Sequence, residues 1–208
     1  MSVKVKICGI TNAPDAHAAT EAGADMLGFV FYDQSPRCVS LHAAADIIRQ
    51  LPLFVVKVGV FVNAPPDFVF RAIADCGLNL LQFHGDEPPD YCLQFGLISM
   101  KAFRIHDAES LQALPNYQTE AWLLDSFVAD KPGGTGKKFH WEFATEAKKF
   151  GRPIFLAGGL TPGNVAEAVA TVQPYAVDVS SGVESSPGKK DPTKICEFVA
   201  NARNAGGL

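Results

Sequence analysis

Hydrophobic segments recur along the chain and alternate with segments that carry helix signals. The segments rich in β-branched and aromatic residues predict eight strands, at residues 3–7, 26–31, 55–62, 80–83, 100–105, 122–124, 154–157 and 176–179. Several of them, such as FVVKVGVFV, are almost continuously hydrophobic instead of alternating. Such runs are typical of parallel strands that are covered on both faces.

The segments between the strands predict a helix after each strand. N-cap residue types precede three of the apolar stripes: Ser40 before LHAAADIIRQ, Thr161-Pro162 before GNVAEAVATV, and Asp191-Pro192 before TKICEFVANA. The segments near 86–95 and 107–114 leave room only for short helices.

Eight strand–helix units predict a single-domain α/β fold, a closed (βα)8 TIM barrel over residues 1–208, with about 26 residues per unit. The main competitor is a doubly wound open sheet, which has fewer strands and a glycine fingerprint after the first. Because Cys8-Gly9-Ile10-Thr11 lacks the G-x-G-x-x-G pattern, the barrel is favoured.

The composition bears on the binding partners of the protein and on its compartment. A net charge of −4 argues against binding to nucleic acid through a general positive field. The five cysteines form no C-x-x-C pair, and their odd number fits a reducing cytoplasm. Because the sequence shows no signal-peptide pattern and no apolar run of about 20 residues, we expect neither export nor a membrane span.

Polar residues at the carboxyl ends of barrel strands share one face and are therefore candidates for a site. Cys8 ends the first strand, where the following glycine would let a ligand approach and a thiolate could abstract a proton. Asp125 follows three apolar residues of the sixth strand. The fourth and fifth strands add Gln82, His84 and Arg104. Taken singly, Cys8 and His84 are weak signals, because lone cysteines are mostly core residues and strand-end histidines often only bond backbone carbonyls.

The loops after the seventh and eighth strands, LAGGL and VSSGV, combine small side chains with exposed backbone N–H groups. Loops at these two places often bind phosphate in barrels. The KPGGTGKK stretch lacks the spacing of a nucleotide-binding P-loop. We expect it, with Gly134 and Gly136, to form a loop that closes over the site.

Arg37 lies on the proline-stiffened loop Ser35-Pro36-Arg37, where its guanidinium can hold a carboxylate bidentately. The histidines at positions 17, 42, 106 and 140 have no metal-ligand spacing. The sequence therefore implies no metal and no other cofactor.

Several segments together resemble the phosphoribosylanthranilate isomerase family from end to end: KICGIT, GFVFYDQSPR, VGVFVN, LQFHGDE, LLDS, GGTGKKF, LAGGLTPGNV and DVSSGVESSPGKKDPTKI. The resemblance implies an Amadori rearrangement of a phosphosugar, N-(5-phosphoribosyl)anthranilate, in tryptophan biosynthesis. It implies general acid–base catalysis without a cofactor. We expect a monomer or a homodimer.

The resemblance also implies a role for each candidate residue. Cys8 of KICG is the general base, Asp125 of LLDS is the general acid, and Arg37 of SPR holds the anthranilate carboxylate. The remaining implied residues are Gln82 and His84 lining the pocket, Asp178 near the sugar, and Gly158, Gly159, Ser180, Ser181 and Gly182 at the phosphate.

Two positions depart from the family pattern, and two other functions stay open. Cys38 stands where the family usually has an aromatic residue, and His140 stands where an aspartate is expected to cap a helix. One alternative is another sugar-phosphate isomerase or epimerase on the same barrel. The other is a non-catalytic phosphate-binding barrel.

Overall fold

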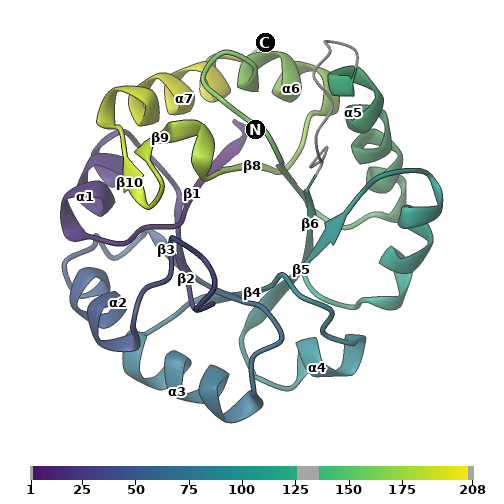
Figure 1. Ribbon diagram of the computed structural model, residues 1–208. Coiled ribbons are helices and arrows are strands. Elements are labelled where there is room, and N and C mark those ends of the chain that lie inside the picture. The colour runs from purple at the N-terminus through teal and green to yellow at the C-terminus, as the bar shows by residue number, and fades with distance from the viewer. Residues whose placement is uncertain (1, 126–135, 206–208) are drawn as a thin grey trace.

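Eight parallel strands, each followed by a helical segment, close into a ring in the computed structural model of this chain, which describes residues 2–125 and 136–205 (Figure 1). Each strand pairs with its neighbours in sequence, and β8 pairs with β1. The strands are β1 Lys4–Cys8, β2 Met26–Val30, β3 Val56–Phe61, β4 Leu80–Phe83, β5 Ile98–Arg104, β6 Ala121–Asp125, β7 Ile154–Ala157 and β8 Ala176–Val179. The predicted (βα)8 barrel is thus confirmed.

The helices lie outside the ring of strands (Figure 1). They are α1 Ala13–Glu21, α2 Leu41–Ile48, α3 Pro66–Cys76, α4 Pro89–Leu93, α5 Gly136–Ala147, α6 Val165–Val172 and α7 Pro192–Ala205, with 3₁₀ helices η1 Glu109–Asn116, η2 Lys148–Phe150 and η3 Ser181–Val183. A small antiparallel pair, β9 Glu184–Ser186 and β10 Lys189–Lys190, is inserted between η3 and α7. The two short helices expected from the sequence are α4 and η1, and the second is 3₁₀ and contains Pro115.

The helix starts agree with the sequence at two of three places. The Ser40 hydroxyl accepts a hydrogen bond from the Ala43 N–H at 3.2 Å and caps α2. Asp191 likewise accepts from two N–H groups at the start of α7. The α6 helix starts later than predicted, because Asn164 accepts from the Thr161 N–H in a turn that precedes the helix.

The expectation that His140 stands at a helix N-cap is wrong. The α5 helix already begins at Gly136, so the backbone of His140 lies within its first turns. A cap residue has to precede the helical backbone angles, and position 140 is inside them.

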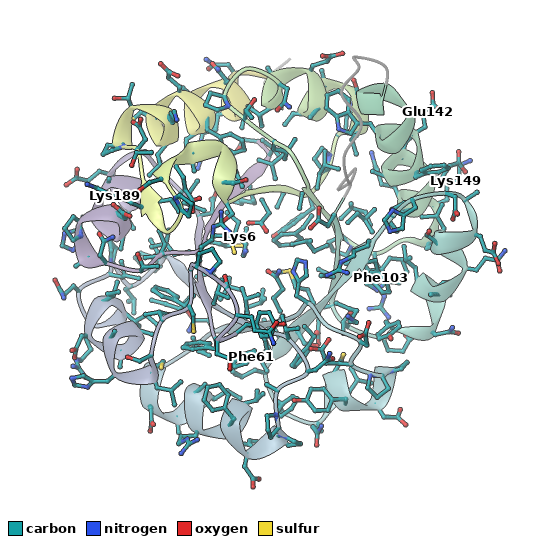
Figure 2. All side chains as sticks on the ribbon, viewed as in Figure 1. Lys6, Phe61, Phe103, Glu142, Lys149 and Lys189 are labelled. Carbon is teal, nitrogen blue, oxygen red and sulfur yellow. The ribbon has the colours of Figure 1, made fainter. Side chains whose placement is uncertain are left out.

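Alternation along the strands separates two apolar layers. Outward-facing residues such as Phe61 pack between the ring and the helices (Figure 2). Inward-facing residues fill the barrel, and the apolar ones are Met26, Val58, Leu80, Met100, Ala102, Ala121, Leu123, Phe155, Ala157 and Ala176. Toward the carboxyl ends of the strands, buried polar residues such as Gln82 and Asp178 lie near a small apolar cluster of Cys8, Val30 and Val60.

In the ranges that the structure describes, no helix is long and apolar enough to cross a membrane. All five cysteines are free thiols.

Candidate active site

Cys8 is the last residue of β1 and lies beside a buried ion pair. Lys6, two residues earlier and hence on the same face of the strand, has a fully buried side chain (Figure 2). Its Nζ donates to Asp178 Oδ1 on β8 at 2.9 Å. A Cβ placed on Gly28 of β2 would lie 2.8 Å from Cys8 Sγ and 3.0 Å from Lys6 Nζ. The sulfur and the ammonium therefore converge above the same glycine.

Burial and charge act in opposite directions on this cysteine. Burial raises the pKa of the Cys8 thiol above its usual range, and the neighbouring Lys6 ammonium opposes that rise. Burial also works against the charge of Lys6, but Asp178 and Cys8 outweigh it, so the pKa of Lys6 is raised. The strand end thus holds a permanent cation next to the thiol.

Arg37 lies over the same end of the barrel in a charged cluster. Its Nε donates to Glu184 Oε1 at 2.8 Å and its Nη2 to Oε2 at 2.7 Å. Lys190 Nζ contacts Glu184 Oε1 at 3.0 Å and donates to the carbonyl of Ser180 at 3.1 Å. Burial acts against the charge of Glu184, but these hydrogen bonds prevail and hold the pKa of its carboxyl below the usual range. The cluster connects the loop after β2 to the segment after β8.

The sequence suggested that Gly9 lets a ligand approach. In the structure the space beside Gly9 is occupied by the side chain of Arg37. A Cβ at Gly9, whose φ is +77°, would lie 2.6 Å from Arg37 Cδ and 3.0 Å from Ser180 Oγ. The arginine stem can therefore pass close to the end of β1. The Ser180 hydroxyl itself donates to the carbonyl of Cys8 at 3.1 Å.

A row of three polar side chains connects the ends of β4 and β6, namely Gln82, His84 and Asp125. Gln82 Nε2 lies 2.8 Å from His84 Nδ1, and His84 Nε2 lies 3.6 Å from Asp125 Oδ2. When the Gln82 amide donates, His84 carries its proton on Nε2, facing Asp125. Among the described residues, Asp125 Oδ1 and Gln82 Oε1 are buried and have no hydrogen-bond partner. Both oxygens are suited to meet a ligand group.

A buried lysine fixes the turn that follows His84. Lys101 Nζ on β5 donates to the carbonyl of Gly85 at 2.6 Å and lies 3.3 Å from Glu87 Oε2. Glu87 in turn accepts from the backbone N–H of Gly85 and of Asn63. This network holds the ends of β3, β4 and β5 together beneath the histidine.

The two phosphate-loop candidates lie against each other. Gly158 and Gly159 follow β7 with φ values of +86° and +63°, which favour glycine. A Cβ at Gly182, after β8, would overlap the carbonyl oxygen of Leu160. The structure therefore brings the predicted residues 158, 159 and 180–182 to one place. Since the Ser180 hydroxyl is directed at Cys8, its backbone N–H is the group that this residue can offer to a phosphate.

The remaining expectations have mixed outcomes. Gly134 lies outside the described residues, and Gly136 begins α5.

Cys38 is exposed and lines an apolar groove of about 500 Å³ between the loops after β2 and β3. Arg104 ends β5 opposite Asp125 in the strand register, and its side chain is exposed. In the described ranges, no group of three His, Cys, Asp or Glu side chains is arranged to hold a metal ion.

Sequence reasoning missed Lys6, Glu184 and Lys190. Lys6 carried a signal that could have found it, because strand alternation places it on the face of Cys8. The other two lie in the η3–β10 segment, where no strand-end rule applies. Glu184 pairs with Arg37, which is far away in sequence, and Lys190 joins the cluster through Glu184, so only the folded chain shows these contacts.

Three comparisons bear on this geometry. The family model described as N-(5'-phosphoribosyl)anthranilate isomerase matches residues 5–201. A relative of that name from Citrifermentans bemidjiense is 58% identical over 203 residues, which cover 96% of this chain and 97% of the relative. A crystal structure of a phosphoribosylanthranilate isomerase in complex with reduced 1-(o-carboxyphenylamino)-1-deoxyribulose 5-phosphate superposes with a TM-score of 0.88 at 40% identity, covering 97% of this chain and 99% of that one.

Another solved structure describes monomers generated from the dimeric enzyme of Thermotoga maritima. It superposes with a TM-score of 0.87 at 40% identity, again over 97% of this chain and 99% of that one. The barrel with its charged mouth is therefore similar to solved isomerases over nearly its whole length.

Proposed function

This chain belongs to the phosphoribosylanthranilate isomerase family, and we propose how its own residues divide the work of the reaction. The protein catalyses the Amadori rearrangement of N-(5-phosphoribosyl)anthranilate to 1-(2-carboxyphenylamino)-1-deoxyribulose 5-phosphate, a step of tryptophan biosynthesis. One observation carries the division of roles. Cys8 and Asp125 are the last residues of β1 and β6, and both point toward the barrel interior at the same end.

Asp125 is the general acid. In its protonated form it delivers a proton to the furanose ring oxygen, while the lone pair of the anthranilate nitrogen opens the C1–O bond and forms an iminium ion. The buried Oδ1, without a partner among the described residues, supports this role. His84 Nε2 lies 3.6 Å from the other carboxyl oxygen, and Gln82 orients the imidazole ring through its contact with His84 Nδ1.

Cys8 is the general base. Its thiolate removes the proton from C2 of the sugar, and the electron pair of that C–H bond moves into the iminium to give an enolamine. The enolamine then tautomerises to the ketone product. All electrons stay within the substrate, so one acid and one base suffice for the rearrangement.

The two ends of the substrate are held apart. Backbone N–H groups of Gly158, Gly159, Ser180, Ser181 and Gly182 take the phosphate. Arg37 takes the anthranilate carboxylate, and Asp178 lies near the sugar hydroxyls. Holding both ends fixes C2 and the ring oxygen between the thiol and the carboxyl group. This lowers the entropic part of the activation barrier.

Replacing the acid and the base one at a time tests these roles. Cys8→Ser and Asp125→Asn should each lower kcat by about 10²–10⁴-fold while the far-UV circular dichroism stays native. Cys92→Ser, which removes a buried thiol on α4, is the matched control and should keep kcat near wild type. Normal turnover by either test variant would remove that residue from its role.

We also propose that the protein is a homodimer of the cytoplasm. Leu53 and Phe54, directly before β3, are 81% and 91% exposed. Ile98 at the start of β5 and Tyr175 before β8 are exposed at the same, amino-terminal end of the barrel. Such an apolar face favours burial against a second copy, and the related Thermotoga maritima enzyme is described as dimeric. Five free thiols fit a reducing compartment.

A further inference from the structure

We propose that Lys6 is a positioning residue for the reaction, whose ammonium opposes the effect of burial on Cys8 and so favours formation of its thiolate, while Asp178 holds that ammonium in place. The proposal deepens the proposed function and rests on Cys8 being the base. Lys6 does not itself touch an atom of the substrate in this scheme. It acts through the sulfur.

The placement of Lys6 supports this role. Lys6 and Asp178 are directly paired in the register of β1 and β8, and their side chains are 2.9 Å apart inside the barrel. The Lys6 side chain has no exposed surface, so water does not screen its charge. Gly28 provides the free volume in which Nζ and Sγ lie next to each other, because any side chain there would meet both atoms.

The charges around the sulfur leave one positive charge unmatched. Three cations act on Cys8, namely Lys6, Arg37 and Lys190. Two carboxylates oppose them, since Asp178 pairs with Lys6, and Glu184 pairs with both Arg37 and Lys190. Three positive charges minus two negative charges leave +1, which a thiolate at Cys8 neutralises. Among the cations, Lys6 is the one that shares the strand face of Cys8.

Lys6 and Asp178 should therefore act on the thiol with opposite signs. Lys6 lowers the pKa of Cys8, and Asp178 raises it, although burial is the largest influence. If the ion pair only tied β1 to β8, removing either partner would loosen the same contact. Both variants would then change the accessibility of Cys8 in the same direction.

The rate of alkylation of Cys8 by iodoacetamide, followed by mass spectrometry across pH, separates the two cases. Lys6→Met should shift the midpoint of the alkylation profile upward by about one pH unit or more, so that the rate near neutral pH falls by at least about tenfold. Asp178→Asn should shift the midpoint downward. Lys101→Met, which removes another buried strand lysine paired with a carboxylate, should leave the midpoint unchanged.

A wild-type or faster alkylation rate in Lys6→Met, or midpoint shifts of the same sign in both test variants, would overturn the proposal. If Lys6→Met does not fold because Asp178 is left buried and unpaired, Lys6→Met/Asp178→Asn removes both charges. Its midpoint should still lie above wild type, because the influence of Lys6 on the thiol exceeds that of Asp178. A midpoint at or below wild type would contradict the proposal.

Turnover separates this inference from the proposed function. In Lys6→Met the ascending limb of the pH profile of kcat/KM should move upward together with the alkylation midpoint. An alkylation shift without a shift of that limb would reject Lys6 as a residue of the reaction. Full activity of Cys8→Ser would instead reject the base assignment, whatever the alkylation profile shows.

Discussion

The guanidinium of Arg37 lies side-on against the carboxylate of Glu184, with Nε 2.8 Å from Oε1 and Nη2 2.7 Å from Oε2. Lys190 binds the same carboxylate, so Glu184 is held from two sides. A bidentate pair of this kind fixes the plane of the guanidinium. Arg37 is thus oriented before any substrate arrives.

Substitutions in this pair should act mainly on KM. Arg37→Ala removes the proposed carboxylate anchor and should raise KM roughly 10–100-fold, as expected for loss of a charge-assisted hydrogen bond. Glu184→Gln should raise KM less, because the arginine remains but loses its orientation. Steady-state kinetics with the anthranilate adduct provide the measurement. Arg203→Ala, which breaks the ion pair between Arg203 on α7 and Asp25, is the control and should leave KM unchanged. An unchanged KM in Arg37→Ala would remove Arg37 from the site.

The close approach of Gly182 to Leu160 predicts that the proposed phosphate site is sensitive to substitution at Gly182. A methyl group at Gly182 would force the two loops apart at a cost of about 1–3 kcal/mol. Gly182→Ala should therefore raise KM by roughly tenfold and weaken inhibition by inorganic phosphate to a similar degree. Gly163→Ala, whose new methyl would meet only Thr161 at an ordinary distance, should leave both constants near wild type. Unweakened phosphate inhibition in Gly182→Ala would count against these loops.

Buried thiols predict how stability depends on alkaline pH. Cys92 is 1% exposed, and burial raises its pKa to about 12. A thiol in the unfolded chain has a pKa of about 8.5. Between these values the folded chain keeps a proton that the unfolded chain has lost. The free energy of unfolding therefore falls with rising pH, by up to about 1.4 kcal/mol per pH unit for this group.

Urea unfolding at several pH values measures this contribution. Cys92→Ala should lose stability less steeply than wild type between about pH 9 and pH 11. Cys196→Ala, an exposed thiol on α7, should lose it as steeply as wild type. Parallel pH dependences for Cys92→Ala and wild type would refute the raised pKa.

The exposed Phe54 predicts a dimer contact. Phe54→Asp places a charge in the apolar face before β3 and should shift the mass measured by light scattering from dimer to monomer. Phe70→Asp, on the outer face of α3, should not change the mass. A wild-type protein that is monomeric at micromolar concentration would contradict the proposed assembly.

The sequence predicted the barrel because parallel strands impose a simple pattern. All eight strands were found, with errors only at their ends, such as β5 starting at Ile98 and β6 ending at Asp125. Helix starts were less secure. Ser40 caps its helix directly, whereas the turn closed by Asn164 delays α6 beyond Pro162. A turn of this kind depends on a side chain that can bond in either direction, which the hydrophobic pattern does not encode.

The placement of the candidate site residues was predictable where a residue ends a strand. Cys8, Gln82, His84 and Asp125 were found by that rule and lie at the same end of the barrel. Lys6 lies one layer deeper, and its ion pair with Asp178 depends on the register between the first and last strands. Glu184 and Lys190 depend on the β9–β10 insertion, whose short strands carry no strong hydrophobic signal. These contacts form only when the barrel closes, so the sequence pattern alone does not predict them.

The proposed reaction requires that the Cys8 thiol and the Asp125 carboxyl group act on the same sugar. The most direct measurement is a crystal structure of this protein with reduced 1-(o-carboxyphenylamino)-1-deoxyribulose 5-phosphate, the ligand seen in a related isomerase. We predict that Cys8 Sγ lies within about 3.5 Å of C2 and that the Asp125 carboxyl lies within hydrogen-bond reach of the oxygen derived from the ring. A ligand bound with either group turned away from the sugar would contradict the account.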